Sequence, residues 1–436
     1  MLKDTDVVIV GTGAAGLFCA LHFPENVKIT MVTKEVADKS DSFLAQGGMC
    51  MLRSDDDFDE YFEDTMRAGH YENNTESVEI MINTSRKVAE ELIGYGVDFE
   101  MNGDELAFTR EGGHSKPRIL FHKDITGREI TSKLLANAKK RKNIEIIEYT
   151  SMLDIVCDEN STNKCYGIVV ADKENNIYAI RAKYTVLACG GLGGLYKHST
   201  NFRHITGDAL AIAYKHNIHM KNIDYIQIHP TTLYSEKSGR RFLISESVRG
   251  EGAILLNKDK ERFCDELLPR DVVTAEIRKQ MEKDDMPYVW LSMENIPEEE
   301  IRSHFPNILE QCLSEGYNPI DECIPVVPAQ HYFMGGIDVN SDSMTSMNNL
   351  YAIGETSCNG VHGKNRLASN SLLESMVFAE RAADAIKKDI TDEELLDEEL
   401  FENKYNISDY NDIDKIKEDY KKIILEEIEK EKKRHE

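Results

Sequence analysis

The sequence predicts an α/β fold: a Rossmann-like domain that is interrupted by an α+β capping domain and followed by a short helical C-terminal extension. Three observations lead to this class. A buried strand runs into a glycine-rich turn near the start of the chain, two later strand-to-glycine junctions follow near residues 188 and 353, and the composition changes between those two junctions. Strands that end in glycine at one sheet edge are typical of doubly wound α/β sheets.

The first unit lies at residues 7–32. Residues 7–10 are a continuous β-branched run, which indicates a strand buried on both faces. Gly11, Gly13 and Gly16 follow in the G-x-G-x-x-G pattern, and apolar residues then recur at helical spacing before a second strand at 27–32. In this pattern the first glycine permits a tight bend, the second lets the backbone approach a pyrophosphate, and the third lets the helix pack on the strand.

The later elements follow the same periodicities. We expect a solvated helix start at 55–64, helices over 76–95 and about 371–387, and strands at 144–148, 167–171, 177–182, 185–188 and 349–353. In the charged tail, one helical stripe is formed by Ile413, Ile416, Tyr420, Ile424 and Ile428. The predicted domains are a nucleotide-binding domain at 1–222 and 338–388, a capping domain at 223–337, and the helical extension at 389–436.

The composition excludes several functional classes. Asp and Glu (78) outnumber Lys and Arg (52), and the formal net charge of −26 argues against a surface for nucleic acid or for anionic membranes. No apolar run is long enough to cross a membrane, and the first residues lack the pattern of a signal peptide. Nine scattered cysteines without a C-x-x-C pair indicate free thiols in a reducing cytoplasm and no metal site.

The glycine pattern by itself does not distinguish an NAD site from an FAD site, because Lys34 follows the second strand where an acidic ribose ligand usually stands. Glu355 at a late strand end offers a second contact region, which favours the longer FAD. Several segments combine His, Arg and Gly: 42–48, 111–115, 227–231, 245–252, 268–271, 330–336 and 362–366. Since Arg binds carboxylates bidentately, these segments predict an FAD oxidoreductase with a cationic pocket for a dicarboxylate.

Six motifs, in order over residues 5–385, resemble the flavoprotein family of succinate dehydrogenases, fumarate reductases and L-aspartate oxidases. Asp41 and Ser42 stand where respiratory members carry a histidine bonded to FAD, so the resemblance implies non-covalent FAD. The segment 110–115 is similar to that of the aspartate oxidases, in which its Glu, here Glu111, faces the substrate's ammonium group. A fumarate reductase or succinate dehydrogenase flavoprotein subunit is the alternative, and a non-catalytic FAD-binding protein is a second one.

The resemblance implies that L-aspartate is oxidised to iminoaspartate, the first step of de novo NAD biosynthesis by the quinolinate route. Oxygen or fumarate is then the acceptor, with functional coupling to quinolinate synthase. The implied catalytic residues are Arg270, Glu111, His229, His331 and Arg366, and the implied substrate-binding residues are Ser245, Gln227 and Glu246. The implied flavin contacts are Gly11, Thr12, Gly13, Ala14, Ala15, Gly16, Lys34, Ser42, Gln46, Gly47, Gly48, Asp208, Glu355, Ser369, Ser371 and Leu372.

Three points of this implied site stay open or depart from the family. Arg270 serves either as a base or as a clamp, and arginine is a poor base at its ordinary pKa; Glu246 and Arg249 are expected to lie on a proton path to it. Ala209 stands where the family often has Gly, which is expected to tighten a helix start. The family continues into a three-helix domain, so the extension at 389–436 is expected to be shortened.

Overall fold

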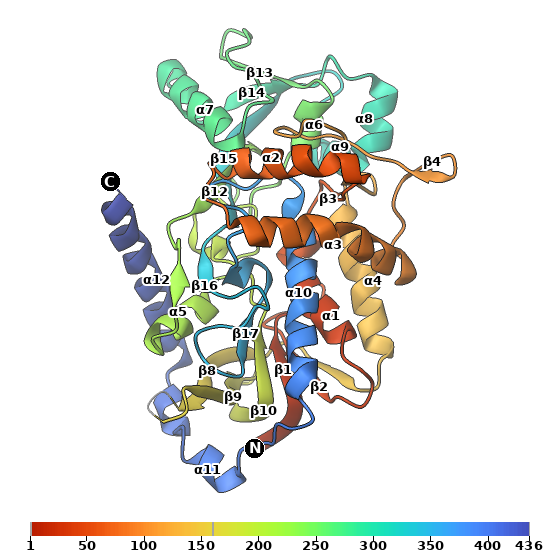
Figure 1. The fold of residues 1–436 in the computed structure, drawn as a ribbon. Coiled ribbons are helices and arrows are strands. Elements are labelled where there is room, and N and C mark those ends of the chain that lie inside the picture. Colours follow the sequence, from red (N-terminus) through yellow and green to blue (C-terminus); the bar gives the residue numbers. More distant parts are fainter. Residues whose placement is uncertain (1, 159–160, 436) are drawn as a thin grey trace.

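A seven-stranded sheet forms the base of the molecule and lies at the bottom of Figure 1. The computed structural model describes residues 2–158 and 161–435. The sheet order is β7 (Ile144–Ile147), β2 (Ile29–Val32), β1 (Leu2–Val10), β10 (Ile177–Leu187), β9 (Lys164–Ala171) and β8 (Ser151–Asp158), and β17 (Leu350–Ala352) also pairs with β10. β7, β2, β1, β10 and β17 are parallel, as in a Rossmann-like sheet, whereas β9 and β8 are antiparallel additions.

Helices cover both faces of this sheet. On β1, Val7 and Ile9 face one apolar cluster while Val8 and Val10 face another, because successive side chains of a strand point to opposite sides. The first cluster includes α1 (Ala14–Leu21), α3 (Thr75–Gly94), α4 (Thr126–Lys140) and α10 (Asn370–Asp389); the second includes α5 (Asp208–Lys215) and α12 (Ile413–His435). The apolar run at 7–10 therefore reflects burial on both faces, as predicted.

β10 corrects the prediction of two short strands at 177–182 and 185–188. It is one strand: β1 pairs with it from Ala179 to Leu187, β9 pairs with its first part and β17 with its last part. Lys183 concealed this continuity in the sequence; its Nζ lies 3.1 Å from a carboxylate oxygen of Asp6 on β1. The helices predicted at 76–95 and 371–387 are confirmed as α3 and α10.

A second, antiparallel sheet has the order β12 (Ile226–Leu233), β15 (Ile324–Phe333), β14 (Val289–Ser292) and β13 (Ile254–Leu256). The accompanying helices are α6 (Glu246–Gly250), α7 (Arg270–Asp284), α8 (Glu298–His304) and α9 (Pro306–Ser314), and most of this layer lies at the top of Figure 1. An apolar core of its own includes Leu255, Ile277 and Val326. This layer falls inside the segment predicted to form the capping domain, whose boundaries at 223 and 337 stay a prediction.

Short elements join these layers. They are α2 (Phe58–Ala68), α11 (Glu398–Glu402), β3 (Met49–Cys50), β4 (Met101–Asn102), β5 (Glu105–Leu106), β6 (Ile119–Leu120), β11 (Met220–Lys221), β16 (Gly336–Asp338), β18 (Ser357–Cys358) and the 3-10 helices η1 (Asp41–Leu44), η2 (Asp55–Asp57), η3 (Gly193–Leu195), η4 (Gly354–Thr356) and η5 (Ile407–Tyr410). The helix start predicted at 55–64 is thus η2 followed by α2, but it is only partly solvated, because Asp57 and Asp64 are buried against Arg118. Among the described residues, no helix has the length and apolar character needed to span a membrane.

The apolar stripe predicted in the tail is confirmed in α12. Tyr420, Ile424 and Ile428 are buried in the same cluster as the apolar side chains of α5, and Ile416 packs against it. In Figure 1, α12 runs along the side of the molecule next to α5. The extension therefore packs on the helix that begins at Asp208, one of the predicted cofactor contacts.

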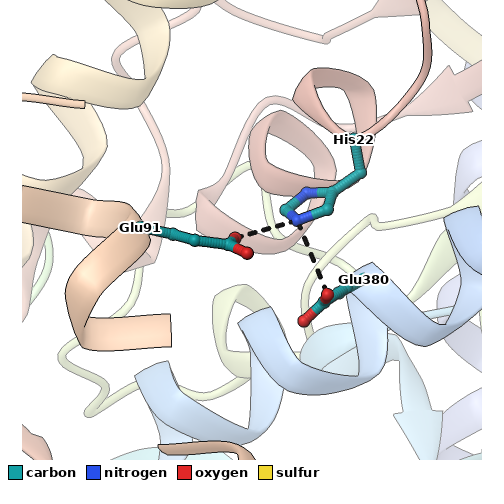
Figure 2. A group of neighbouring side chains, drawn as sticks. All are labelled: His22, Glu91 and Glu380. Carbon is teal, nitrogen blue, oxygen red and sulfur yellow. Dashed lines mark hydrogen bonds and ion pairs between the residues drawn. The ribbon is translucent and has the colours of Figure 1, made fainter. Parts of the chain in front are cut away.

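A polar cluster connects α1 with α3 and α10. Figure 2 shows His22, at the end of α1, pointing toward Glu91 of α3 and Glu380 of α10. His22 Nε2 lies 3.0 Å from Glu91 Oε2 and 3.9 Å from Glu380 Oε1, and Lys87 also contacts Glu380. These contacts hold α1 and α10 against each other, and both helices begin at the cavity described next.

Candidate active site

A cavity of about 330 Å³ lies at the carboxyl edge of the large sheet, where β1 ends. The turn after β1 requires glycine: Gly11 has a φ of +115°, and a Cβ there would lie 2.0 Å from the carbonyl oxygen of Ala188. At Gly16, a Cβ would lie 2.3 Å from the carbonyl oxygen of Gly11, so this glycine lets α1 pack against the turn. Strand, turn and helix therefore meet as the glycine pattern predicts.

The N-terminus of α1 lines this cavity through Gly13, Ala14 and Ala15. Ser42 accepts a hydrogen bond from the Ala14 N–H at 2.9 Å, which places the hydroxyl of Ser42 at the start of the helix. The unpaired N–H groups and the positive dipole end of a helix N-terminus attract anions. This end of α1 therefore suits a pyrophosphate.

Most of the predicted cofactor contacts line the cavity. They are Gly11, Thr12, Gly13, Ala14, Ala15, Lys34, Ser42, Gln46, Asp208, Glu355, Ser371 and Leu372. The predicted contacts that do not line the cavity are Gly16, Gly47, Gly48 and Ser369. They lie next to residues that line the cavity, or they support such residues. At Gly48, for example, a Cβ would lie 2.2 Å from the carbonyl oxygen of Leu120, and the Gly48 N–H donates to Ser369 Oγ at 3.1 Å.

The polar side chains around the cavity fit a dinucleotide that carries hydroxyl and ring N–H groups. Lys34 Nζ pairs with Asp208 Oδ2 at 2.5 Å. Glu355 accepts from the Phe333 N–H at 2.9 Å, and its burial raises its pKa to about 8. Gln46 Oε1 is buried without a hydrogen-bond partner among the described residues. Because buried acceptors are rarely left unpaired, these groups fit the donors of the predicted FAD.

Arg270 anchors a chain of hydrogen bonds beside this cavity. Its Nε donates to Glu246 Oε2 at 2.5 Å, and its NH1 group donates to Gln227 Oε1 at 2.9 Å. Gln227 Nε2 in turn donates to Asn365 Oδ1 at 2.9 Å and to the carbonyl oxygen of Arg366 at 2.8 Å. The chain joins the start of α7, the start of α6, β12 and the loop before α10, and it fixes the orientation of the guanidinium group.

Two buried histidines and a second arginine lie close to this chain. His229 on β12 and His331 on β15 meet edge to face, with ring centroids 5.1 Å apart. Burial, and then the charge of Arg270, lowers the pKa of both histidines well below the usual value, so both are neutral at neutral pH. Arg366 lies 4.6 Å from the centre of the Tyr332 ring, and burial lowers its pKa to about 10, which leaves it cationic.

Unsatisfied polar atoms point to an anionic ligand here. His229 Nε2 and Arg366 Nε are buried and have no hydrogen-bond partner within the described part of the chain. Leaving such groups unpaired costs about 1–3 kcal/mol each. A carboxylate would satisfy both kinds of group, since it accepts up to four hydrogen bonds.

Glu111 is, with Glu246, one of two buried carboxyl groups of the site. Ser247 Oγ donates to Glu111 Oε1 at 2.8 Å, and Ser369 Oγ donates to Glu111 Oε2 at 2.5 Å. Burial raises the pKa of Glu111, and the charge of Glu246 raises it further. Ser245 is placed less directly: its Oγ accepts from the Ser247 N–H at 3.3 Å and so caps α6.

The structure brings in three residues that the sequence did not assign. Thr200 Oγ1 lies 2.8 Å from His331 Nδ1, Asn365 pairs with Gln227, and Ser247 holds Glu111. Ser247 and Asn365 fall inside the segments 245–252 and 362–366, whose composition marked them without giving them roles. Thr200 lies in a loop, and the sequence around it carries no comparable signal.

Comparison with known proteins agrees with this geometry. Residues 6–372 match the FAD binding domain family. The L-aspartate oxidase of Clostridium perfringens is 47% identical over 429 residues, which cover 98% of this chain and 95% of that protein. The chain belongs to the L-aspartate oxidase family of FAD-binding flavoproteins. FAD is therefore its cofactor, and the family resemblance read from the sequence is confirmed.

Other members of this family and related structures match over most of the chain. The L-aspartate oxidase of a Nostoc species is 40% identical over 88% of this chain and 68% of its own length. Among solved structures, the FrdA subunit of the E. coli quinol fumarate reductase has a TM-score of 0.85 at 29% identity, over 92% of this chain and 73% of that one. A flavocytochrome c3 fumarate reductase has a TM-score of 0.70 at 25% identity, over 89% of this chain and 79% of that one. The fold is therefore that of the fumarate reductase flavoproteins, as predicted.

Proposed function

We propose that the chain is an L-aspartate oxidase that oxidises L-aspartate to iminoaspartate and so carries out the first step of de novo NAD biosynthesis. The observation that carries this assignment is a buried carboxylate, Glu111, next to the buried cations Arg270 and Arg366. An amino dicarboxylate requires both signs of charge in one pocket. Succinate and fumarate have no ammonium group, so they would not need the carboxylate.

The two arginines bind the two carboxylates of the substrate. Arg270 is held in one orientation by Glu246 and Gln227, so little further entropy is lost when a carboxylate binds. The neutral His229 and His331 supply hydrogen-bond donors without adding further positive charge. Arg270 therefore serves this reaction as a clamp.

Glu111 orients the α-amino group. Its carboxylate accepts a hydrogen bond from the ammonium and takes up the proton that must leave nitrogen before Cα is oxidised. The raised pKa of Glu111 suits this role, because a base works best when its pKa lies near the working pH. When bound, FAD supplies the acceptor for the hydride that leaves Cα, and the resulting product is the imine.

The proposal extends to the cofactor and to the electron acceptor. Asp41 and Ser42 leave no histidine at the position of the covalent link, so FAD is held non-covalently. Oxygen or fumarate regenerates the cofactor; fumarate has the two carboxylates that the pocket recognises, and the likeness to fumarate reductases supports it. The imine is then consumed by quinolinate synthase, and the free state of all nine cysteines supports a reducing cytoplasm.

Product analysis with two acceptors tests this function. With L-aspartate in air, the protein should form hydrogen peroxide and the imine in equal amounts; without air, added fumarate should be reduced to succinate. D-Aspartate is the matched control and should give neither product. Oxidation of succinate without oxidation of L-aspartate would contradict the proposal and favour a succinate dehydrogenase or fumarate reductase subunit.

A further inference from the structure

A chain of three side chains, Cys157, His216 and Asp154, lies outside the residues that line the cofactor cavity. Cys157 Sγ lies 3.3 Å from His216 Nδ1, and His216 Nε2 lies 2.7 Å from Asp154 Oδ1. Cys157 and Asp154 come from β8, and His216 ends α5. Cys157 is half-buried.

The charges in this chain favour a cationic imidazole. Burial tends to raise the pKa of Asp154, but its contacts with His216 and then Lys215 outweigh this and lower it, so Asp154 is a carboxylate. Burial tends to lower the pKa of His216, but the hydrogen bonds to Asp154 and Cys157 raise it to about 10. An imidazolium therefore stands against the sulfur at neutral pH. A neighbouring cation stabilises a thiolate, which is the reactive form of cysteine.

Lys215 and two tyrosines also lie around Asp154. Lys215 Nζ lies 2.9 Å from Asp154 Oδ2, and the Tyr410 hydroxyl donates to the same oxygen at 3.3 Å. The Tyr420 hydroxyl donates to the Leu153 carbonyl oxygen at 2.6 Å and accepts from Lys215 at 3.3 Å. Oδ1 of Asp154 accepts from His216 and from the Ile155 N–H at 3.0 Å, while Lys215 and Tyr410 contact Oδ2. These contacts fix the carboxylate, which orients the imidazole toward Cys157.

A second cysteine–histidine contact differs from the Cys157–His216 pair in burial and in charge. Cys50 Sγ lies 3.9 Å from His114 Nε2, but both residues are buried. Burial lowers the pKa of His114 to about 4 and raises the pKa of Cys50. That pair is neutral and closed to solvent, so proximity of the two residue types does not by itself make a reactive thiol.

We propose that Cys157 is a peroxide-reactive thiol, activated by His216 and Asp154 and separate from the catalytic site. The thiolate attacks one oxygen of a hydroperoxide; the S–O bond forms as the O–O bond breaks, and sulfur loses two electrons. The imidazolium gives its Nδ1 proton to the leaving hydroxide, and for hydrogen peroxide the products are a sulfenic acid and water. The proposal does not depend on the aspartate reaction, because any hydroperoxide serves as the oxidant.

Labelling of the wild-type holoenzyme tests the proposal without any variant. The protein is treated with limiting hydrogen peroxide and a dimedone-type probe for sulfenic acid, and the labelled peptides are quantified by mass spectrometry. Cys157 should be labelled about 10-fold faster than Cys264 and Cys323, because the His216 imidazolium lies beside its sulfur and can protonate the leaving oxygen. Both comparison cysteines are also half-buried, and neither has a hydrogen bond to histidine among the described residues. Equal labelling of the three cysteines would overturn the proposal.

Two substitutions identify the cause of the reactivity. His216→Asn should lower the labelling of Cys157 to the level of Cys264. His22→Asn is the matched control, because His22 also ends a helix and pairs with a carboxylate, but its imidazole has no hydrogen bond to a cysteine side chain among the described residues; this change should leave the labelling unchanged. Flavin absorbance and thermal unfolding verify that both variants are folded. Undiminished labelling in folded His216→Asn would contradict the role of the imidazolium, whereas Cys157→Ser should remove the label and keep aspartate oxidation.

Discussion

Glu111 lies between the hydroxyl groups of Ser247 and Ser369, with both carboxylate oxygens occupied by donors. Its burial raises its pKa, so the carboxylate forms at a higher pH than in an ordinary glutamate. The substrate's ammonium group needs this carboxylate, whereas the carboxylates of fumarate do not. In the proposed function, Glu111 would therefore affect the amino-acid half-reaction more than the fumarate half-reaction.

Glu111→Gln should lower kcat/KM for L-aspartate by roughly 10- to 150-fold, because a hydrogen bond to a charged group contributes about 1.5–3 kcal/mol. Fumarate reduction with an artificial donor should fall much less. In the wild type, KM for L-aspartate should rise as the pH falls through the raised pKa of Glu111, and this rise should vanish in the variant. Steady-state kinetics of both half-reactions provide the measurement, and equal losses in both would contradict the ammonium role.

The sequence could name most of this site because its residues lie in short motifs whose chemistry is specific. Arg270, His229 and His331 were predicted in this way, and the structure brings them together. Thr200 was not predictable, because its contact with His331 joins a loop to the strand β15, which lies far away in the chain. The assignment of Ser245 to the substrate stays a prediction; in the structure its hydroxyl caps α6.

At the scale of elements, α12 supports the cofactor cavity through α5. Ile424 is 2% exposed and packs near Gly207, the residue before α5, whereas Leu425 on the other face is 42% exposed. α5 begins with Asp208, which pairs with Lys34 in the cavity. The sequence predicts the stripe of apolar residues on α12. It does not predict the partner helix, because helical periodicity shows that one face is buried but not which surface that face covers.

Ile424→Ala should destabilise the protein by about 2–4 kcal/mol, since it leaves a cavity in a packed interface. It should also speed the release of FAD, because the start of α5 loses support. Leu425→Ala is the matched control and should change stability by less than about 0.5 kcal/mol. Thermal unfolding and the recovery of flavin fluorescence measure the two effects; similar behaviour of the two variants would show that α12 does not support the cavity.

The contact between His216 and Asp154 joins β8 to the end of α5 and predicts a pH dependence of stability. The pKa of His216 is raised to about 10 in the folded chain, above its ordinary 6.5. The resulting stabilisation is complete below pH 6.5 and is lost as the pH rises toward about 10. Over this pH window, the free energy of unfolding of the wild type should therefore fall by at least about 1 kcal/mol more than that of His216→Asn. Denaturant unfolding at each pH provides the measurement. If the free energies of unfolding of the two proteins changed in parallel with pH, His216 would not contribute to the pH dependence of stability.

At the scale of the whole molecule, a strongly acidic protein encloses a cationic site. The formal net charge is −26, yet Arg270 and Arg366 are buried in the pocket with two neutral histidines. The net charge argues against nucleic-acid binding but gives no information on the site, because exposed charges set the distant field and buried charges set the local one. Fumarate, as the proposed dianionic acceptor, would therefore approach against the overall field and bind through the local one.

The ionic strength should change the balance between repulsion by the acidic surface and attraction by the buried cations. Raising the ionic strength from about 0.01 M to about 0.15 M shortens the Debye length from about 30 Å to about 8 Å, which screens the distant repulsion more than the buried attraction. kcat/KM for fumarate should rise about twofold over this range. Turnover with oxygen is the matched control, because oxygen is uncharged. A fall in the fumarate value would show that the positive pocket, and not the acidic surface, controls the approach.

The substrate assignment is tested most directly by mixing the oxygen-free holoenzyme with L-aspartate and, separately, with succinate, while the flavin absorbance is followed. L-Aspartate should bleach the flavin rapidly and completely, and succinate should bleach it slowly or not at all. Rapid bleaching by succinate, with no response to L-aspartate, would contradict the assignment of Glu111 to the ammonium group and of the chain to aspartate oxidation.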